Sequence, residues 1–546
     1  MPEIEAKFLV QRPKQLQSVI RTLRELGFTI NQGPSEALQD SYFDTPDWVI
    51  FRAGLAYRCR QKGDSKTLAL KALSGGRGPV FARDEIEQPL PHAGWPGGEL
   101  PDGPVSERLQ QIINGHRSHE LFRVRTERTL YQVSGSNDDP VTMELALDRS
   151  EILTQAPVPG QPPQTLSFTE LELELEEGSR EALTTIARNL SERTGLLPAQ
   201  LSKFERGLYA ARLEPPQTPP EEHHFTRDHR LLDLAYDRLG RQFTLVKRQA
   251  PRAWEGLEPE SVHRMRVAIR RIRAMLRALR DMAPDDVMAG FNREFRWLST
   301  ALGNVRDADV QNYELHGYLD SLHGAGAREL TRYARQLEKQ RRKARAGLIN
   351  VLSSQRYDEL ISTFQRFVEA GRSPATLQRA GDLSIGVGAD ALLLKATDKL
   401  LRSGRGIRND SDPEKLHALR IQTKRARYLL ECFNDCYENR LEALLAGLRR
   451  LQNVLGDYQD TFIACGRLQT YAASRSTKKA NRQELLALGC LLQIQREHAE
   501  KARGRFPKAW RRCGQAVVEV MRQSKHRSAG RATGPEKRGP AGARFQ

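Results

Sequence analysis

The alternating stretch Glu170-Leu171-Glu172-Leu173-Glu174-Leu175 constrains the fold of this chain more than any other segment. Successive side chains of a β-strand point to opposite faces, so a strand here carries glutamates on one face and leucines on the other. The stretch Glu3-Ile4-Glu5-Ala6-Lys7 places three more charged side chains on one face of a second strand. Taken alone, either stretch is typical of an exposed strand, and the glutamate–leucine run is equally compatible with a helix.

Short segments of partly alternating polarity surround these two stretches throughout residues 1–207. Such segments, separated by turn-rich stretches, are typical of antiparallel strands. We expect strands at Glu3–Val10, Leu55–Arg60, Thr67–Lys71, Arg83–Pro89, Arg128–Val133, Thr142–Asp148 and Phe168–Leu175. Helical spacing predicts helices at Pro13–Leu26 and Ser179–Thr194. Many antiparallel strands with alternating charge predict a barrel or sandwich with one charged face.

Carboxylates gathered on one surface repel one another unless a cation lies among them. Mg²⁺ and Mn²⁺ prefer carboxylate oxygens and leave coordination positions open for phosphate and water. The same alternation along other strands places basic side chains nearby, and these neutralise phosphate oxygens. They are Arg58, Arg60, Lys71 and Arg83, with Arg128, Lys203 and Arg206 as further candidates. The combination predicts an interior with a metal-binding floor and a phosphate-binding wall.

Eight motifs follow one another in an order that resembles the CYTH, or triphosphate tunnel metalloenzyme, superfamily over roughly residues 1–208. They are Glu3-Ile-Glu5-Ala-Lys7, Asp40-Ser-Tyr-Phe-Asp-Thr45, Gly54-Leu-Ala-Tyr-Arg58-Cys-Arg60, Thr67-Leu-Ala-Leu-Lys71, Arg83-Asp-Glu85, Glu144-Leu-Ala-Leu-Asp148, Glu170-Leu-Glu172-Leu-Glu174 and Leu201-Ser-Lys203-Phe-Glu-Arg206-Gly207. The resemblance implies an eight-stranded antiparallel barrel that encloses a tunnel.

The resemblance also implies roles for individual residues. Mg²⁺ or Mn²⁺ would be held by Glu3, Glu5, Glu170, Glu172 and Glu174. The catalytic cations would be Lys7, Arg58 and Arg60. The remaining substrate-binding residues would be Lys71, Arg83, Arg128, Lys203 and Arg206, with Asp148 assisting at the tunnel. Some relatives pair the signature lysine with a tyrosine, but Leu26-Gly27-Phe28 has no phenol at that place, so we expect metal-activated water as the nucleophile.

Charge divides the chain into two parts. Residues 1–212 carry 25 Lys and Arg against 29 Asp and Glu, a net charge of −4, so the remainder carries 61 against 39, a net of +22. A proline-rich stretch of the kind found in semi-rigid linkers separates them at residues 213–222. We therefore expect an α+β multidomain chain: a tunnel domain at 1–208, a linker at 209–224, an all-α domain at 225–515 and a basic, disordered tail at 516–546.

The helical part contains an internal duplication. The run from His263 to Arg273 (HRMRVAIRRIR) is echoed 154 residues later by the run from His417 to Arg427 (HALRIQTKRAR). Downstream, the turn Leu302-Gly303-Asn-Val-Arg-Asp307 is echoed 153 residues later by Leu455-Gly456-Asp-Tyr-Gln-Asp460. Each basic run falls on one face of a helix. A solvated arginine-rich face is the plainer interpretation, but its duplication favours a polyanion groove.

This second half resembles the CHAD domain, a conserved-histidine α-helical domain, over about residues 225–515. The resemblance implies a pair of helical bundles with a basic cavity associated with inorganic polyphosphate. The binding residues would then be His263, Arg266, Arg270, Arg273, His417, Arg420, Lys424 and Arg427. Neither histidine has a second ligand at zinc spacing, so we expect both to donate hydrogen bonds to phosphate.

The location of the protein is predicted from what its sequence lacks. The acidic start of the chain is not a signal peptide, and no run of eighteen apolar residues predicts a membrane span. The cysteines form no CxxC pair, as is usual in the reducing cytoplasm; they are Cys59, Cys432, Cys436, Cys465, Cys490 and Cys513. We expect a cytoplasmic protein associated with polyphosphate granules.

The leading hypothesis is a metal-dependent triphosphatase that hydrolyses inorganic tripolyphosphate to pyrophosphate and phosphate, with a helical domain that binds inorganic polyphosphate. A second enzyme hypothesis changes the reaction to that of a thiamine triphosphatase, a nucleotide triphosphatase or an adenylate cyclase. A third is a non-catalytic polyphosphate- or nucleic-acid-binding protein, although anion binding gains nothing from five carboxylates. Nucleic acid is disfavoured as the main partner because aromatic residues make up only 7% of the chain, too few for a stacking platform.

Overall fold

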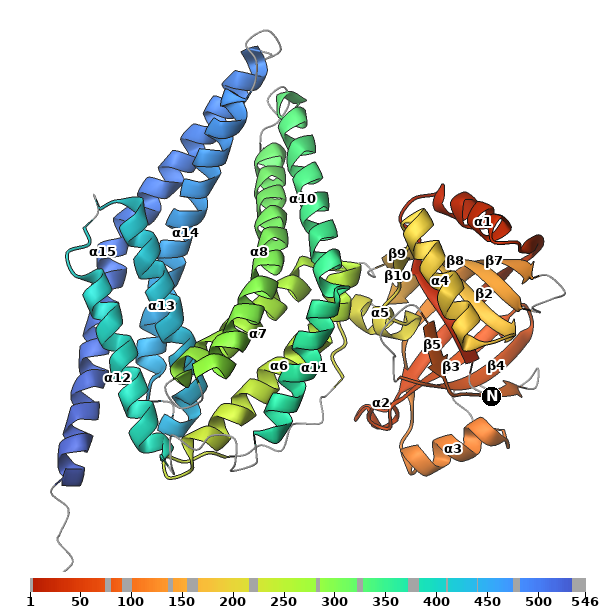
Figure 1. Ribbon diagram of the computed structural model, residues 1–546, viewed down its shortest axis with the longest axis horizontal. Helices are drawn as coiled ribbons and strands as arrows, with labels where there is room; N and C mark the ends of the chain where they lie inside the picture. The colour runs from red at the N-terminus through yellow and green to blue at the C-terminus, as the bar shows by residue number, and fades with distance from the viewer. Residues whose placement is uncertain are drawn as a thin grey trace, which may run out of the picture. The chain divides into compact units, whose positions relative to one another are not determined.

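The computed structural model describes residues 3–73, 80–90, 101–135, 141–154, 165–215, 224–280, 285–321, 328–371, 383–408, 411–438, 440–474 and 482–532. The chain forms two compact units, Met1–Glu222 and His223–Gln546, each taken by itself below (Figure 1). The boundary falls within the predicted linker at 209–224, of which residues 216–223 lie outside the described part.

The first unit is built on one antiparallel sheet of ten strands. The strands are β1 (Glu3–Leu9), β2 (Thr29–Asp44), β3 (Leu55–Lys62), β4 (Ser65–Ala72), β5 (Val80–Arg83), β6 (Glu85–Leu90), β7 (His119–Ser134), β8 (Thr142–Thr154), β9 (Thr165–Glu177) and β10 (Leu197–Pro198). Their order in the sheet is β10-β1-β9-β8-β7-β2-β3-β4-β6, and β5 pairs with β1.

Residues 80–90 close this sheet on itself. β5 pairs with β1, placing Arg83 opposite Glu3, while β6 pairs with β4, placing Glu85 opposite Lys71. Only Asp84 separates β5 from β6, so the two act as one bent strand that joins the β1 edge of the sheet to the β4 edge. With β10 a two-residue addition to β1, the wall has eight strands, and the predicted eight-stranded antiparallel barrel is confirmed.

The sequence interpretation missed β2, a strand of 16 residues that pairs with both β3 and β7. Its middle contains Gly33-Pro34, a dipeptide that is normally a turn signal. The strand passes this point through an irregularity in its pairing with β7, between Gln32 and Ser35. Pairing with β7 on either side of this point therefore outweighs the local preference for a turn.

Five helices accompany the sheet: α1 (Gln15–Glu25), α2 (Val49–Arg52), α3 (Pro104–Ile113), α4 (Arg180–Thr194) and α5 (Lys203–Ala210). The predicted helices at Pro13–Leu26 and Ser179–Thr194 are confirmed as α1 and α4. Leu171 and Leu173 of β9 pack in one core cluster with Val19 of α1 and Leu183 of α4. Burying each leucine contributes about 1.5–3 kcal/mol, and this turns the glutamates of β9 toward the interior.

Helix α5 packs against the inner face of the sheet. A capping box formed by Ser202 and Glu205 starts the helix, so that Lys203 is its first residue. The Phe204 ring lies 5.5 Å from the Tyr42 ring and 6.0 Å from the Phe122 ring. A Cβ atom at Gly207 would lie 1.9 Å from Phe122 Cε2, so only glycine permits this approach. The helix thereby presents Lys203 to the interior.

The second unit is helical throughout its described residues. Its elements are α6 (Leu231–Glu255), α7 (Pro259–Ala278), α8 (Asp285–Ser321), α10 (Thr331–Leu352), α11 (Gln355–Ala370), α12 (Ile385–Gly404), α13 (Pro413–Phe433), the 3₁₀ turn η3 (Asn434–Tyr437), α14 (Glu442–Ala473) and α15 (Arg482–Ala532). Neighbouring contacts run α6–α7–α8–α10 in the first half and α12–α13–α14–α15 in the second, and α7 packs against α13 (Figure 1). The predicted duplication is therefore a repeat of a four-helix unit.

Two predictions for this unit are wrong. The repeated Leu-Gly-x-x-x-Asp segments are not turns, because they lie inside the continuous helices α8 and α14. The tail predicted to be disordered from residue 516 is helical as far as Ala532, since α15 continues through Pro507 and the basic residues that follow. Residues 533–546 lie outside the described part.

The two halves of the helical unit are joined where each begins. Ile385 N–H donates to His229 O at 2.8 Å, and Gly386 N–H donates to Arg227 O at 2.7 Å. Asp390, almost fully buried, accepts hydrogen bonds from Arg227 Nη2 at 2.7 Å and from Tyr437 Oη at 2.6 Å. Asp390, in the second half, thus holds in place the segment around Arg227 that leads into the first half.

Replacing Asp390 by alanine should therefore destabilise the helical unit by about 3 kcal/mol, because it leaves a half-buried guanidinium without its counter-charge. Urea denaturation of the full chain measures this loss. Asp398→Ala is the matched control, since Asp398 pairs with Arg402 on the exposed side of the same helix and should cost about 0.5 kcal/mol or less. Equal losses in the two variants would contradict the role given to Asp390.

Candidate active site

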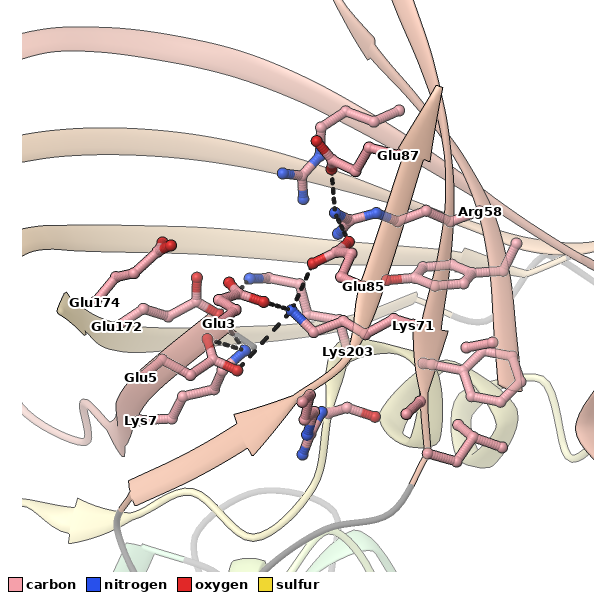
Figure 2. A pocket seen from close by; sticks show the side chains of 18 of the residues that line it. Glu3, Glu5, Lys7, Arg58, Lys71, Glu85, Glu87, Glu172, Glu174 and Lys203 are labelled. Carbon is pink, nitrogen blue, oxygen red and sulfur yellow. Dashed lines mark hydrogen bonds and ion pairs between the residues drawn. The ribbon is translucent and has the colours of Figure 1, made fainter. Parts of the chain in front are cut away.

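The interior of the first unit contains a cavity of about 440 Å³. Every tunnel residue implied by the CYTH resemblance lines it, with three exceptions: Glu170, Arg206 and the assisting Asp148. Figure 2 shows acidic and basic side chains from several strands pointing into this space. The lining also includes Glu85, Glu87, Tyr42, Ser202 and Phe204.

Strand register explains why residues so far apart in sequence meet here. β1 and β9 are antiparallel neighbours in which Glu5 lies opposite Glu174 and Lys7 opposite Glu172. Because side chains alternate along a strand, all four of these residues project to the same face. On the next strand Glu144 lies opposite Glu174. The first and last motif strands therefore form one acidic surface interrupted by Lys7.

Lys203 fills the centre of a triangle of buried carboxylates. Its Nζ lies 2.7 Å from Asp148 Oδ2, 2.8 Å from Glu170 Oε1 and 2.9 Å from Glu172 Oε1. Oxygens of these three residues lie within 4.8 Å of one another, a spacing that would also suit a metal ion. Burial opposes the charges, but Lys203 lowers the pKa of Glu172 well below its ordinary value. An ammonium group thus neutralises this carboxylate triangle.

Glu170 and Arg206 lie behind the cavity wall and not on it. The Arg206 side chain is completely buried, and its Nη1 lies 2.6 Å from Glu170 Oε2. Its guanidinium also lies 4.4 Å from the centre of the Phe168 ring. These two residues, a metal ligand and a substrate ligand by resemblance, here hold Lys203 from behind.

Asp40 positions two of the cavity arginines, a role that the sequence interpretation did not assign to it. Arg60 Nε and Nη2 donate to its two carboxylate oxygens at 2.8 and 3.0 Å, and Arg58 Nη1 lies 3.7 Å away. Burial favours the neutral acid, but Arg58 and Arg60 outweigh it and lower the pKa of Asp40 to about 2. The pairing register, with Asp40 opposite Arg60, follows only once β2 is known.

Glu85 is a second residue that sequence reasoning left without a role. It accepts hydrogen bonds from Arg58 Nη2 at 2.9 Å and from Lys71 Nζ at 3.0 Å. Lys71 also forms an ion pair with Glu3, and its Nζ lies 4.0 Å from Glu5 Oε1 (Figure 2). Lys71 therefore lies between the carboxylates of β1 and Glu85 of β6.

Negative charge is only partly compensated beside β1 and β9. Burial, together with repulsion from Glu3 and Glu5, raises the pKa of Glu174 to about 7. Glu5 Oε1 is buried, and no described residue donates a hydrogen bond to it. Buried carboxylate oxygens that lack partners are ligands that a hard divalent cation prefers. The residues present therefore fit Mg²⁺ or Mn²⁺, which Glu3, Glu5 and Glu174 would hold.

Lys7 is suited to binding an anion and not to accepting a proton. Its Nζ lies 2.9 Å from Glu172 Oε1 and 3.0 Å from Glu5 Oε2. Burial disfavours the charged ammonium, but Glu172 and Glu5 outweigh burial and raise the pKa of Lys7 above its ordinary value. The side chain therefore stays protonated at neutral pH and cannot serve as the general base.

The basic runs of the helical unit form two equivalent contacts with carboxylates. Arg266 Nη1 lies 3.3 Å from Asp307 Oδ1, and Arg420 Nη2 lies 3.4 Å from Asp460 Oδ1. Burial, then Arg420 and Arg270, lowers the pKa of Lys424 to about 7. The two runs thus meet near Lys424, which lies within electrostatic reach of Arg270 from the other helix. His263 is half-buried and His417 is exposed.

Among the described residues, no helix is both long enough and apolar enough to cross a membrane.

Replacing Glu174 by glutamine should stabilise the metal-free protein at pH 8 but not at pH 5. A folded-state pKa of about 7, above the ordinary 4.5, means that the protonated carboxyl stabilises the fold at low pH, and this stability is lost as the pH rises through 7. Solvent screens part of the repulsion, so we expect a gain of about 2–4 °C in the unfolding midpoint at pH 8. Scanning calorimetry in EDTA measures it.

Glu87→Gln is the matched control, because Glu87 lies at the exposed rim of the same cavity. It should leave the midpoint unchanged at both pH values. A stabilisation by Glu174→Gln that is equal at pH 5 and pH 8 would show that charge repulsion is not its cause.

Comparison with known proteins finds two domain families. Residues 1–208 match the CYTH domain and residues 237–469 match the CHAD domain. An uncharacterised protein of Mycobacterium tuberculosis is 25% identical over 506 residues, which cover 89% of this chain and 92% of that protein.

Two solved structures each resemble about half of this chain. The CHAD domain from the plant Ricinus communis is 25% identical with a TM-score of 0.44, covering 54% of this chain and 96% of its own. PptA from Streptomyces chartreusis is 22% identical with a TM-score of 0.43, covering 52% of this chain and 99% of its own. With a family match on each of its two units, this chain is a CYTH domain followed by a CHAD domain.

Proposed function

We propose that the CYTH domain hydrolyses inorganic tripolyphosphate to pyrophosphate and phosphate with Mg²⁺ or Mn²⁺. One observation carries this proposal: a single cavity contains both a carboxylate group whose charge is only partly compensated and a wall of buried cations. Glu5 and Glu174 supply the first, and Arg58, Lys71 and Lys203 belong to the second. CYTH domains are the domains of triphosphate tunnel metalloenzymes, so a phosphoanhydride substrate suits this cavity.

The side chains divide the work of binding a triphosphate. Lys7, Arg58 and Arg60 line the same cavity and neutralise phosphoryl oxygens, and charge stabilisation of this kind supplies most of the rate in phosphoryl transfer. Asp40 and Glu85 hold the arginines in place before substrate arrives. A divalent cation bound at Glu3, Glu5 and Glu174 would polarise a phosphoryl group and lower the pKa of water.

An inorganic substrate suits this cavity better than a nucleotide or thiamine triphosphate. A base or thiazole ring needs an apolar surface to pack on. The two aromatic rings in the lining, Tyr42 and Phe204, already pack against each other and against Phe122. The rest of the apolar lining is Ala56, Ala72 and Leu73, so the alternative reactions of thiamine triphosphatase, nucleotide triphosphatase and adenylate cyclase have only a small described apolar surface for the organic group.

The CHAD domain is proposed to bind inorganic polyphosphate. The basic runs of α7 and α13 lie on helices that pack together, which brings Arg270 near Lys424. Polyphosphate would replace Asp307 and Asp460 as the partner of Arg266 and Arg420. Binding of this kind would keep the protein with polyphosphate granules in the cytoplasm.

Phosphate release from tripolyphosphate tests the first proposal. Glu5→Gln should lower the metal-dependent rate roughly a hundredfold or more, because it removes a buried charge that would hold the cation. Glu87→Gln, at the rim of the cavity, should retain most of the activity. If the unaltered protein released no phosphate with either metal, tripolyphosphatase activity would be excluded, and ATP and thiamine triphosphate would be assayed next.

Retention on immobilised polyphosphate tests the second proposal. The double change Arg270→Glu and Lys424→Glu in the full chain should abolish retention and leave tripolyphosphate hydrolysis unchanged. Arg402→Glu with Lys399→Glu, on α12, makes the same change of net charge and should retain binding. DNA that competes with polyphosphate equally well at matched salt would make nucleic acid the partner instead.

A further inference from the structure

The two copies of the basic helix differ at one position that changes what the surrounding arginines can bind. With the 154-residue offset, Arg271 on α7 corresponds to Arg425 on α13, and Arg277 corresponds to Glu431. The duplicated unit therefore contains an internal comparison, because the same geometry appears once with a carboxylate and once with a guanidinium.

In the second copy the carboxylate neutralises its neighbours. Glu431 Oε2 lies 3.2 Å from Arg271 Nη2, and Glu431 Oε1 lies 3.2 Å from Arg427 Nη1. The corresponding residues in the first copy are Arg277 and Arg425, which line one cavity and repel each other as like charges. The second copy therefore supplies its own carboxylate at this position, Glu431, whereas the first copy has Arg277 there and no carboxylate.

A cavity of about 600 Å³ opens around Arg277. Its lining contains six arginines, contributed by α7 and the short segment after it, by α8 and by α13: Arg273, Arg277, Arg280, Arg293, Arg296 and Arg425. The Arg273 Nε donates a hydrogen bond to Asn292 Oδ1 at 3.1 Å. Within the described ranges, no carboxylate forms an ion pair with any of the six.

Burial and mutual repulsion lower the pKa values of two arginines in this cavity. Burial, then Arg273 and Arg425, lowers the pKa of Arg277 to about 10. Burial, then Arg296 and Arg425, lowers the pKa of Arg273. An anion among these guanidinium groups would remove the repulsion and form charge-assisted, bidentate hydrogen bonds.

We propose that this arginine pocket binds the terminal phosphate group of an inorganic phosphate anion, at the place where Glu431 supplies a carboxylate in the other copy. A terminal phosphate carries more charge and more free oxygens than an internal one, which suits a pocket with several guanidinium forks. Free pyrophosphate and the end of a polyphosphate chain share this chemistry. The proposal rests on the proposed affinity of the CHAD domain for phosphate polyanions, but not on hydrolysis in the tunnel.

Calorimetric titration of the full chain with pyrophosphate tests the pocket. EDTA is present, and Arg58→Ala with Lys71→Ala removes the response of the tunnel. Arg277→Glu gives the first copy the carboxylate of the second, so we expect pyrophosphate to bind roughly tenfold more weakly or worse. Glu431→Gln frees Arg271 and Arg427, and should strengthen binding or add a second site. Arg402→Glu is the control for net charge and should change nothing.

The source of the phosphate is distinguished by repeating the titration with long-chain polyphosphate. Loss of pyrophosphate binding alone identifies a free anion, and loss of both identifies a chain end. The proposal is overturned if Arg277→Glu folds normally and binds both ligands as the parent does. Should that variant unfold, Arg277→Gln supplies the same comparison without an added charge. If Arg270→Glu with Lys424→Glu abolished polyphosphate retention and Arg277→Glu left it unchanged, the proposed function of the CHAD domain would stand. The arginine pocket would then play no part in polyphosphate binding.

Discussion

The neutralisation of buried carboxylates is the constraint on which the first unit depends. Asp148, Glu170 and Glu172 are all buried within a few ångströms of one another, a placement that would be prohibitive without the ammonium of Lys203 among them. Arg206 compensates Glu170 from behind the wall. With these charges balanced, Glu174 and the one oxygen of Glu5 that accepts no hydrogen bond from a described residue are left for a cation that the chain does not supply, while Lys7 pairs with the other oxygen of Glu5.

The sequence interpretation succeeded where alternation alone decides orientation. The stretch from Glu170 to Leu175 was predicted to carry its glutamates on one face of a strand and its leucines on the other. Leu171 and Leu173 do pack outward against α1 and α4. It failed where pairing overrides local signals, as at Gly33-Pro34 in β2, and consequently missed Asp40 as the partner of Arg60. The sequence also did not predict how deeply each side chain is buried, because no sequence pattern separates a residue that lines the cavity from one that lies behind its wall.

The helical unit shows how a duplication becomes asymmetric without a change of fold. Arg266–Asp307 and Arg420–Asp460 preserve the same contact in both copies. Arg277 and Glu431 do not, and a single charge at one helical position decides whether a cluster of arginines is satisfied internally or stays open to a ligand. The difference between Arg277 and Glu431 is apparent only when the two copies are compared, because each copy taken alone is a basic helix.

The sheet register has a consequence for how the protein is made. Lys7 contacts Glu172, 165 residues further along the chain, and β1 also pairs with β10 near residue 198. Such separations slow folding, because chain entropy is lost before the contacts form. On a ribosome, which delivers the N-terminus first, β5 emerges early enough to pair with β1, but Lys7 must wait for Glu172, and the buried carboxylates must wait for Lys203. A nascent chain that ends before Lys203 therefore lacks the ammonium group that neutralises these carboxylates.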